Sequence, residues 1–347
     1  MERLTPFPEG FYFDCMKYLP LLFWVVFISC ESNALPEQQS DSVAIEYESE
    51  FDSINTLLKS KPDNAELYNY RATLRENEND FESAIGDLNR AIEVDSLNDQ
   101  WYLRKANLLF DLERFKESKD VLDNAIFIVP GSVPIMLRKS EIYLITGDLQ
   151  QCLNWANAAL NFDVFNAQAY YLKGMAHKYG RDTVKAVTSF QTAVEQDINH
   201  YEAYMQLGNL YALEKHELAP SYYQNALRIN PKSIEAYYGK GLYFQNIGKS
   251  NLALKEYKEI LKIDSDFPSA YYNMGYVKLI QLEEVDTASV LFNKAFSSDN
   301  NYFDALYMIG YCQELKGEKQ QARKTYKTVL ENVPTHLLAA KGLSRVE

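Results

Sequence analysis

Small side chains and apolar positions return along this chain at a nearly constant interval. One series of small residues has intervals of 34, 34, 34, 34, 33, 34 and 35, and it runs Ala72, Ala106, Ser140, Gly174, Gly208, Gly241, Gly275, Gly310. A second series runs Ala84, Ser118, Cys152, Ala186, Ala219, Ala253, Ala288, Ala322. A third runs Ala91, Ala125, Ala159, Ala193, Ala226, Ile260, Ala295, Val329. Agreement among three series indicates an internal repeat with a period near 34 residues.

Two irregular spacings predict where each repeat turns. The step from the first series to the second is 12 residues, except for 11 in the fifth unit and 13 in the seventh. Because loops accept length changes and packed helices do not, we expect both changes in a turn between two helices, near His216 and near 284–286. A second turn is marked by prolines, which lack the backbone N–H that a helix needs, at Pro130, Pro231 and Pro334. Each unit is therefore predicted to be a pair of short helices.

Small residues on one helix and large residues on the next predict how the pairs pack. Small side chains let two helix backbones approach closely, and bulky ones fill the space beside them. The second helices supply the bulk in the later units, through Phe190, Tyr223, Tyr257, Phe292 and Tyr326. A single pair cannot bury both of its apolar faces, so neighbouring pairs must stack. Residues 44–61 align with a second helix only and residues 335–347 with a first helix only, which predicts capping helices at the two ends.

The pattern resembles the tetratricopeptide repeat. The shared features are a period of 34, a small residue at the eighth place, Ala at the twentieth and twenty-seventh, an aromatic residue at the twenty-fourth and Pro at the thirty-second. The resemblance covers residues 65–334, or eight units. It departs from the pattern at Ser118, Cys152, Ile260 and Val329, and proline is missing from five of the eight turns between units. It implies an all-α fold, a right-handed α–α superhelix in which the first helices form a concave inner wall. It also implies a non-catalytic scaffold that binds a partner protein or peptide segment in that groove.

The family architecture directs the second, fifth, ninth and twelfth places of each first helix into the groove. In the later units these places are rich in tyrosine, and the candidate contact residues are Tyr171, Met175, Asn209, Tyr238, Tyr272, Tyr276, Tyr307 and Tyr311. Tyrosine offers a large contact area at low entropy cost together with a hydroxyl, which favours a partner-binding strip. In the alternative interpretation these tyrosines pack between neighbouring units, since the chain has 26 of them.

Three residues of the early units partly resemble a carboxylate clamp. In related repeats, cationic and amide side chains on the inner wall hold the C-terminal carboxylate of a peptide, and arginine suits that role through bidentate hydrogen bonds. Arg104 and Arg138 lie at the sixth place of successive units, and Asn107 lies at a ninth place. The lysines and the second asparagine of such clamps are absent here. The alternative is that these arginines are ordinary charges offset by nearby acids.

The N-terminal residues predict export. The run from Leu19 to Ile28 is apolar and ends at Ser29 and Cys30. It is shorter than the roughly 18 apolar residues that a membrane-spanning helix needs, and is typical of the apolar region of a signal peptide. Residues 1–15 contain three acids and two prolines, unlike the basic start of such a peptide. We therefore expect translation to begin at Met16 and residues 16–29 to be the signal peptide.

A small residue followed by cysteine resembles the end of a bacterial lipoprotein signal, with Phe27 where that motif usually has leucine. The resemblance implies a lipid on Cys30, a flexible tether over residues 30–43, and a location in the bacterial cell envelope, at the outer membrane on its periplasmic or surface side. The alternative is an ordinary signal peptide in which Cys30 is incidental.

Composition and motifs narrow the chemistry. A hydrophobic fraction of 47% supports a continuous core, and a net charge of −13 repels nucleic-acid phosphates. The four histidines have no partner at metal-ligand spacing, and no catalytic or cofactor motif occurs, so we expect no metal, no cofactor and no enzyme activity. Two other functions remain open. Tyrosine faces also stack on sugar rings, which would suit a glycan-binding lipoprotein, and the capping helices could assemble copies of the chain into a homo-oligomer.

Overall fold

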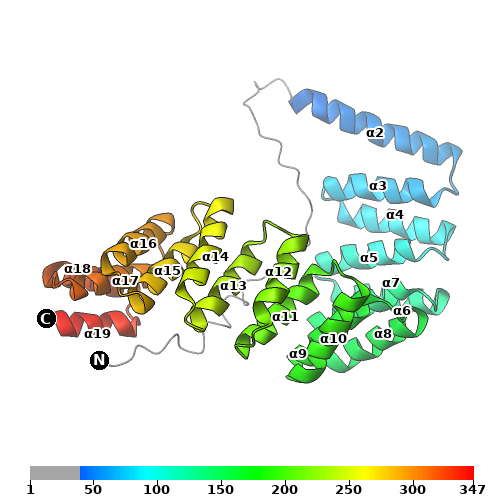
Figure 1. Cartoon of the computed structure of the whole chain (residues 1–347). Coiled ribbons are helices and arrows are strands. Elements are labelled where there is room, and N and C mark those ends of the chain that lie inside the picture. The colour runs from blue at the N-terminus through cyan, green and yellow to red at the C-terminus, as the bar shows by residue number, and fades with distance from the viewer. Residues whose placement is uncertain (1–39) are drawn as a thin grey trace. The chain divides into compact units, whose positions relative to one another are not determined.

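The computed structural model describes residues 40–347, with side chains from residue 50 onward. The described residues divide into two units, of which the first ends at Asp63 and the second is Asn64–Glu347. The described part of the first unit contains one helix, α2 (Ser40–Ser60), which begins four residues before the predicted helix 44–61 and ends one residue before its predicted end (Figure 1). The predicted signal peptide, Cys30 and most of the predicted tether lie outside the described residues.

The second unit is a succession of helix pairs that ends in a single helix (Figure 1). The pairs are α3 (Ala65–Asn77) with α4 (Phe81–Val94), α5 (Asp99–Asp111) with α6 (Phe115–Ile128), α7 (Val133–Ile145) with α8 (Leu149–Phe162), α9 (Ala167–Tyr179) with α10 (Thr183–Gln196), α11 (Tyr201–Leu213) with α12 (Ala219–Ile229), α13 (Ile234–Asn246) with α14 (Ser250–Ile263), α15 (Pro268–Tyr276) and the π-helix η1 (Val277–Gln281) with α16 (Val285–Ser298), and α17 (Phe303–Leu315) with α18 (Lys319–Asn332). The last helix is α19 (Leu337–Val346). Asparagine, aspartate or serine caps begin many of these helices by accepting a backbone N–H, as Asn166 does from Ala169 at 3.0 Å.

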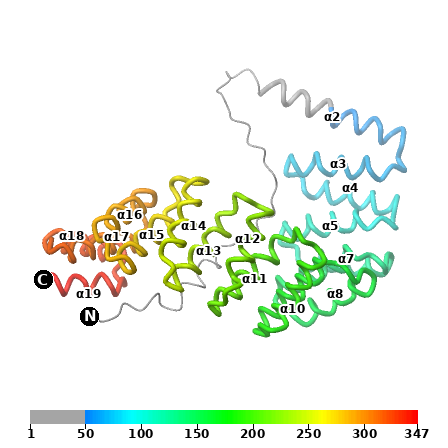
Figure 2. Tube along the Cα trace, in the orientation of Figure 1, coloured from blue at the N-terminus to red at the C-terminus, as the bar shows by residue number. Residues whose placement is uncertain are grey.

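Contacts in the second unit are made between near neighbours along the chain. Each helix packs on the one before it and the one after it, which Figure 2 lets the reader follow along the trace. In addition, first helices of adjacent pairs contact each other, as α5 does with α7, α7 with α9, α11 with α13 and α17 with α19. No comparable contacts join the second helices of adjacent pairs among the described residues. At these junctions the first helices lie closer together than the second helices, as expected for the inner wall of a curved stack.

The predicted fit of small residues against rings is confirmed. A methyl group added to Gly174 would lie 2.5 Å from the ring of Phe190, and one added to Gly241 would lie 2.6 Å from the ring of Tyr257. Both rings are fully buried. In the first two units, where the eighth place is alanine, leucine replaces the ring. The residue at the eighth place, which sets how closely the two helix backbones approach, thus varies together with the size of the side chain that packs against it.

Two serines at the small-residue positions of the repeat have buried hydroxyls that form hydrogen bonds. Ser118 is fully buried, and its Oγ donates to the backbone oxygen of Ala106 at 2.7 Å. Ser140 is also buried, and its Oγ donates to the backbone oxygen of Cys152 at 2.8 Å. Because an unpaired buried hydroxyl would be costly, these bonds explain how serine is tolerated beside the helix crossing.

The turns inside the pairs all contain one residue with a left-handed backbone, at Asn79, Glu113, Gly147, Arg181, Lys215, Gly248, Glu283 and Gly317. This residue usually lies five positions before the second series of small residues. In the fifth unit Lys215 lies four positions before Ala219, so the deletion is in the turn, as predicted.

The insertion of the seventh unit is located differently. Glu283 keeps the usual five positions before Ala288, but it lies eight positions after Gly275 instead of seven. The additional residue is therefore inside the first helix, where the structure has the π-helix η1. A wider helical turn accepts one extra residue without shifting the packed residues on either side. The prediction of a change inside the turn was wrong for this unit.

Candidate partner-binding surface

Four tyrosines at the fifth place of the first helices share the same surroundings. Each ring lies beside the aromatic residue of its own second helix and beside a ring that caps the next first helix. The centroid distances are 5.8 and 5.0 Å for Tyr171 with Phe190 and His200, 6.2 and 6.4 Å for Tyr238 with Tyr257 and Phe267, 5.5 and 5.1 Å for Tyr272 with Phe292 and Tyr302, and 5.8 and 5.2 Å for Tyr307 with Tyr326 and His336. Tyr307 is buried at 5% exposure, and the other three keep partial exposure. These rings therefore both join units and face the inner wall.

The hydroxyl groups of Tyr171 and Tyr272 lie in desolvated surroundings. Burial raises the pKa of Tyr272 well above its ordinary value, and the nearby Tyr302 and Asp304 raise it further. Burial also raises the pKa of Tyr171, with the charge of Glu202 as the next cause. No hydrogen bond from either hydroxyl is found within the part of the chain that the structure describes. Each phenol thus stays protonated and has a donor and an acceptor to offer.

The ninth-place candidates are also on the inner wall. Met175 is half-buried and packs against the core formed by α9, α10 and α11. Asn209 is exposed, and its Oδ1 accepts a hydrogen bond from the Tyr223 hydroxyl at 2.8 Å. Tyr276 and Tyr311 are half-buried, and the ring of Tyr311 stacks on Tyr307 with centroids 6.4 Å apart. The later units therefore present a mixture of rings, a thioether and an amide.

Arg104 has several partners on the preceding unit. Its guanidinium donates to the backbone oxygen of Asn69 at 3.1 Å and to Thr73 Oγ1 at 2.7 Å, and it pairs with Glu76 Oε1 at 3.0 Å. All three partners are on α3, whereas Arg104 is on α5. The arginine therefore joins two first helices and has few donors left for a peptide carboxylate.

Arg138 is held in a similar way within its own unit and the one before it. It is 7% exposed, its guanidinium pairs with Glu141 at 2.7 Å, and it lies over the ring of Phe110 at 4.7 Å. Asn107 is half-buried, and no hydrogen-bond partner for its Oδ1 is found among residues 40–347. These contacts favour the interpretation of the two arginines as structural charges over the carboxylate clamp.

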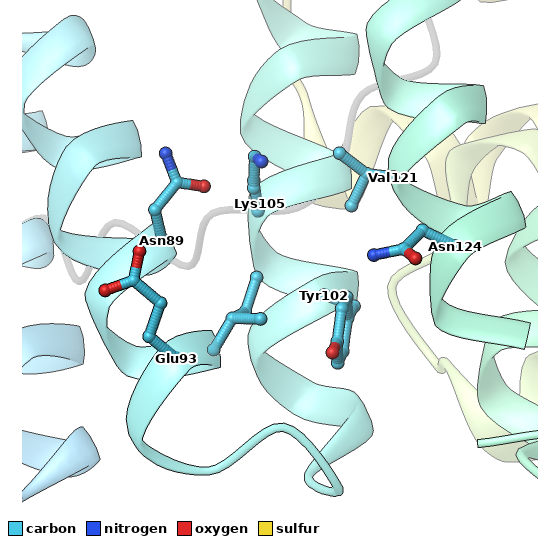
Figure 3. A pocket seen from close by; sticks show the side chains of 7 residues that line it. Asn89, Glu93, Tyr102, Lys105, Val121 and Asn124 are labelled. Carbon is cyan, nitrogen blue, oxygen red and sulfur yellow. The ribbon is translucent and has the colours of Figure 1, made fainter. Parts of the chain in front are cut away.

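A surface pocket of about 270 Å³ lies between the first two pairs. Figure 3 shows side chains of α4 on one side, those of α5 in the middle and those of α6 on the other. The lining residues are Asn89, Ile92, Glu93, Tyr102, Lys105, Val121 and Asn124. Burial lowers the pKa of Lys105, and the Tyr102 hydroxyl donates to the backbone oxygen of Ser96 at 3.1 Å. Because two of its three lining helices are second helices, this pocket is separate from the tyrosine surface.

Sequence reasoning missed the rings that cap the first helices: His200, Phe267, Tyr302 and His336. A signal for them exists in the repeat. Wherever the fifth place is tyrosine, a ring occupies the residue before the next first helix, and wherever the fifth place is another residue, that cap is asparagine or serine. The two positions thus vary together because their side chains touch.

Within residues 40–347, no group of three or more histidine, cysteine, aspartate or glutamate side chains could hold a metal ion. No helix in that range has the length and apolar composition needed to cross a membrane.

Stacked helix pairs that contact only near neighbours define an α-helical repeat protein. Sequence models described as Tetratricopeptide repeat match residues 71–133, 171–234, 234–267 and 304–336, which together make up more than half of the chain. The chain belongs to the tetratricopeptide-repeat family, and the predicted fold class is confirmed. Proteins with this fold are generally non-catalytic scaffolds for protein interactions, and this chain has that architecture.

Relatives and solved structures share the repeat over part of their length. The "DnaJ protein P58IPK homolog B" of Oryza sativa subsp. japonica is 24% identical over 306 residues, covering 80% of this chain and 65% of that protein. The "Protein O-mannosyl-transferase TMTC3" of Homo sapiens is 22% identical, over 86% of this chain and 34% of that protein. The chain therefore spans less than two thirds of the length of these relatives. The C-terminal part of a TPR repeat-containing protein from Cytophaga hutchinsonii has the same fold, with a TM-score of 0.60, 17% identity, and coverage of 69% of this chain and 98% of that one.

Proposed function

We propose that this protein is a non-catalytic scaffold whose inner wall binds a segment of a partner protein. The observation that carries the proposal is the row of tyrosines along the first helices, all of which except Tyr307 keep partial exposure and whose rings are held by packing against neighbouring rings. A rigid aromatic surface loses little conformational freedom on binding, and therefore converts contact area into affinity efficiently. The proposal assigns no reaction to the chain.

Site-specific crosslinking would test where the partner binds. A photo-reactive amino acid at Asn209 or Tyr311 samples the inner wall, and the same amino acid at Lys258 samples an exposed position on a second helix. We expect a partner to be crosslinked from the two inner positions and not from Lys258. Equal adducts from all three positions, or adducts from Lys258 alone, would contradict binding on the inner wall.

We also propose that the chain is attached to a bacterial membrane through a lipid on Cys30, which places the scaffold in the cell envelope. The support is the apolar run from Leu19 to Ile28 and the cysteine that follows it. Metabolic labelling with a fatty acid should label the wild-type protein and leave Cys30→Ser unlabelled. Labelling that persists in Cys30→Ser would show that the lipid, if present, is attached elsewhere.

A further inference from the structure

One inner-wall site combines a tyrosine, a capping ring and a carboxylate between the fourth and fifth units. The ring of Tyr171 lies 5.0 Å from His200, and Glu202 Oε2 lies 3.4 Å from His200 Nδ1. That nitrogen accepts the backbone N–H of Ala203 at 3.4 Å, so in this role it carries no proton to donate to Glu202. The Glu202 side chain is 60% exposed. A carboxylate with free acceptor capacity and the desolvated phenol of Tyr171 therefore both lie beside the His200 ring.

The same arrangement recurs between the seventh and eighth units. The ring of Tyr272 stacks on Tyr302 with centroids 5.1 Å apart, and Asp304 follows two residues later in the first turn of α17. Asp304 Oδ1 lies 3.2 Å from His336 Nε2, and its side chain is 41% exposed. One carboxylate oxygen is thus bound to the chain, and the other is open to a ligand.

Two further tyrosines have the capping ring without the acid. Tyr238 lies beside Phe267, and the equivalent position two residues after that ring is Ser269. Tyr307 lies beside His336, and the equivalent position is Leu338. The aromatic pairing is therefore a packing device of the repeat, to which only two units add a carboxylate.

A carboxylate in the first turn of a helix has a structural explanation, because it complements the helix dipole. That explanation accounts for the acids of both sites and leaves the two tyrosine hydroxyls unexplained. A cationic side chain accounts for both features, because an ammonium or guanidinium group donates hydrogen bonds to a phenol oxygen and pairs with a carboxylate. The net charge of −13 also attracts cationic partners over a distance.

We propose that the Tyr171–Glu202 and Tyr272–Asp304 sites bind lysine or arginine side chains of the partner, so that the partner segment carries two separated basic residues. This inference rests on the proposed function of the inner wall and specifies the chemistry of its partner.

Peptide selection on the intact protein would test the inference. The probe is a random-sequence peptide library displayed on phage, followed by affinity measurements on the enriched peptides by fluorescence anisotropy. The variant Glu202→Gln with Asp304→Asn removes both carboxylates while keeping the shape of the side chains. The matched control, Glu195→Gln with Glu331→Gln, removes two exposed charges from second helices and leaves the net charge equal to that of the first variant.

We expect enriched peptides to carry lysine or arginine, and each lost carboxylate to weaken their binding by about two- to fivefold. The control variant should bind like the wild type. Ser269→Asp, which adds the acid to a neutral site, should strengthen binding of peptides with a third basic residue.

Three results would overturn the inference. Peptides without basic residues, bound on the inner wall, would refute it and leave the proposed function standing. Equal losses in the test and control variants would show that only net charge matters. A selection that enriches no peptide on the wild type would count against the proposed function as well.

Discussion

The contact between Gly174 and Phe190 predicts that Gly174→Ala destabilises the protein, whereas the same change at the uncrowded Gly86 should stabilise it. Gly174→Ala would place a methyl group 2.5, 2.6 and 3.0 Å from three atoms of the buried Phe190 ring. Overpacking of this kind costs about 1–3 kcal/mol, and three close atoms put the cost near the upper end. Alanine in place of glycine in a helix returns about 1 kcal/mol. The expected net loss of unfolding free energy is about 2 kcal/mol.

The chain itself supplies the compensating change. In the second unit Ala106 occupies the eighth place and Leu122 the twenty-fourth, and both are fully buried. Phe190→Leu alone should cost about 1–2 kcal/mol, below the range for truncation of phenylalanine to alanine. The double variant should then be more stable than the sum of the two single changes predicts, with a coupling of about 2 kcal/mol.

Urea unfolding followed by circular dichroism measures these differences, provided that the slopes of the transitions agree among variants. The control is Gly86→Ala, at an exposed position of α4 with no atom within 4 Å of the added methyl group. It should raise the unfolding free energy by up to about 1 kcal/mol. Additive effects of the two core substitutions, or a stabilising Gly174→Ala, would refute the claim that ring size and backbone approach are matched.

Three further outcomes are expected. Burial raises the pKa of tyrosines such as Tyr171 and Tyr272 in the folded protein. Their contribution to the free energy of unfolding should therefore be complete below about pH 10, where tyrosine ionises in the unfolded chain, and should fall above that pH. Urea midpoints that stay constant to about pH 11 would contradict this. Burial raises the pKa of the Cys312 thiol to about 12. In a variant with the other three cysteines changed to serine, the folded protein should therefore react with a disulfide reagent on the order of a thousandfold more slowly than the unfolded protein. Comparable rates would disprove the burial of this thiol. Asp87 is 2% exposed and pairs with Arg71 at 2.6 Å and with Arg75 at 2.9 Å. Asp87→Asn should therefore lower the unfolding free energy by about 3 kcal/mol. A loss below about 1 kcal/mol would show that these two ion pairs can be replaced by neutral hydrogen bonds.

Periodicity predicted the features of the fold that repeat. Eight helix pairs, the turns between them and the fit of Gly174 to Phe190 all follow from one constraint, which is that each pair must bury two apolar faces against its neighbours. The location of the extra residue in the seventh unit could not be predicted from the spacing of small residues alone. A longer turn and a wider helical turn both lengthen the interval from Gly275 to Ala288 by one residue. Which of the two occurs depends on the local backbone geometry at Val277–Gln281.

Side-chain partners were predicted less well than helices. The residue type and place of Arg104 suit a peptide clamp, but its bonds go to Asn69, Thr73 and Glu76, about one repeat earlier in the chain. A place in the repeat specifies which wall a residue faces, whereas its partner depends on the rotamers of long side chains. The capping rings could have been found, since they vary together with the fifth-place tyrosines.

The tyrosines of this surface link binding to stability, and this link decides which substitutions are informative. Tyr307 is 5% exposed and its ring lies beside Tyr311, Tyr326 and His336, so truncation to alanine would open a cavity at a junction between units. Lost binding in such a variant would say little about the inner wall. Changing Tyr272 to phenylalanine keeps the ring and removes only the hydroxyl, so the variant can separate the two roles. The same coupling favours a rigid wall, because each contact ring is held by the core before a partner arrives.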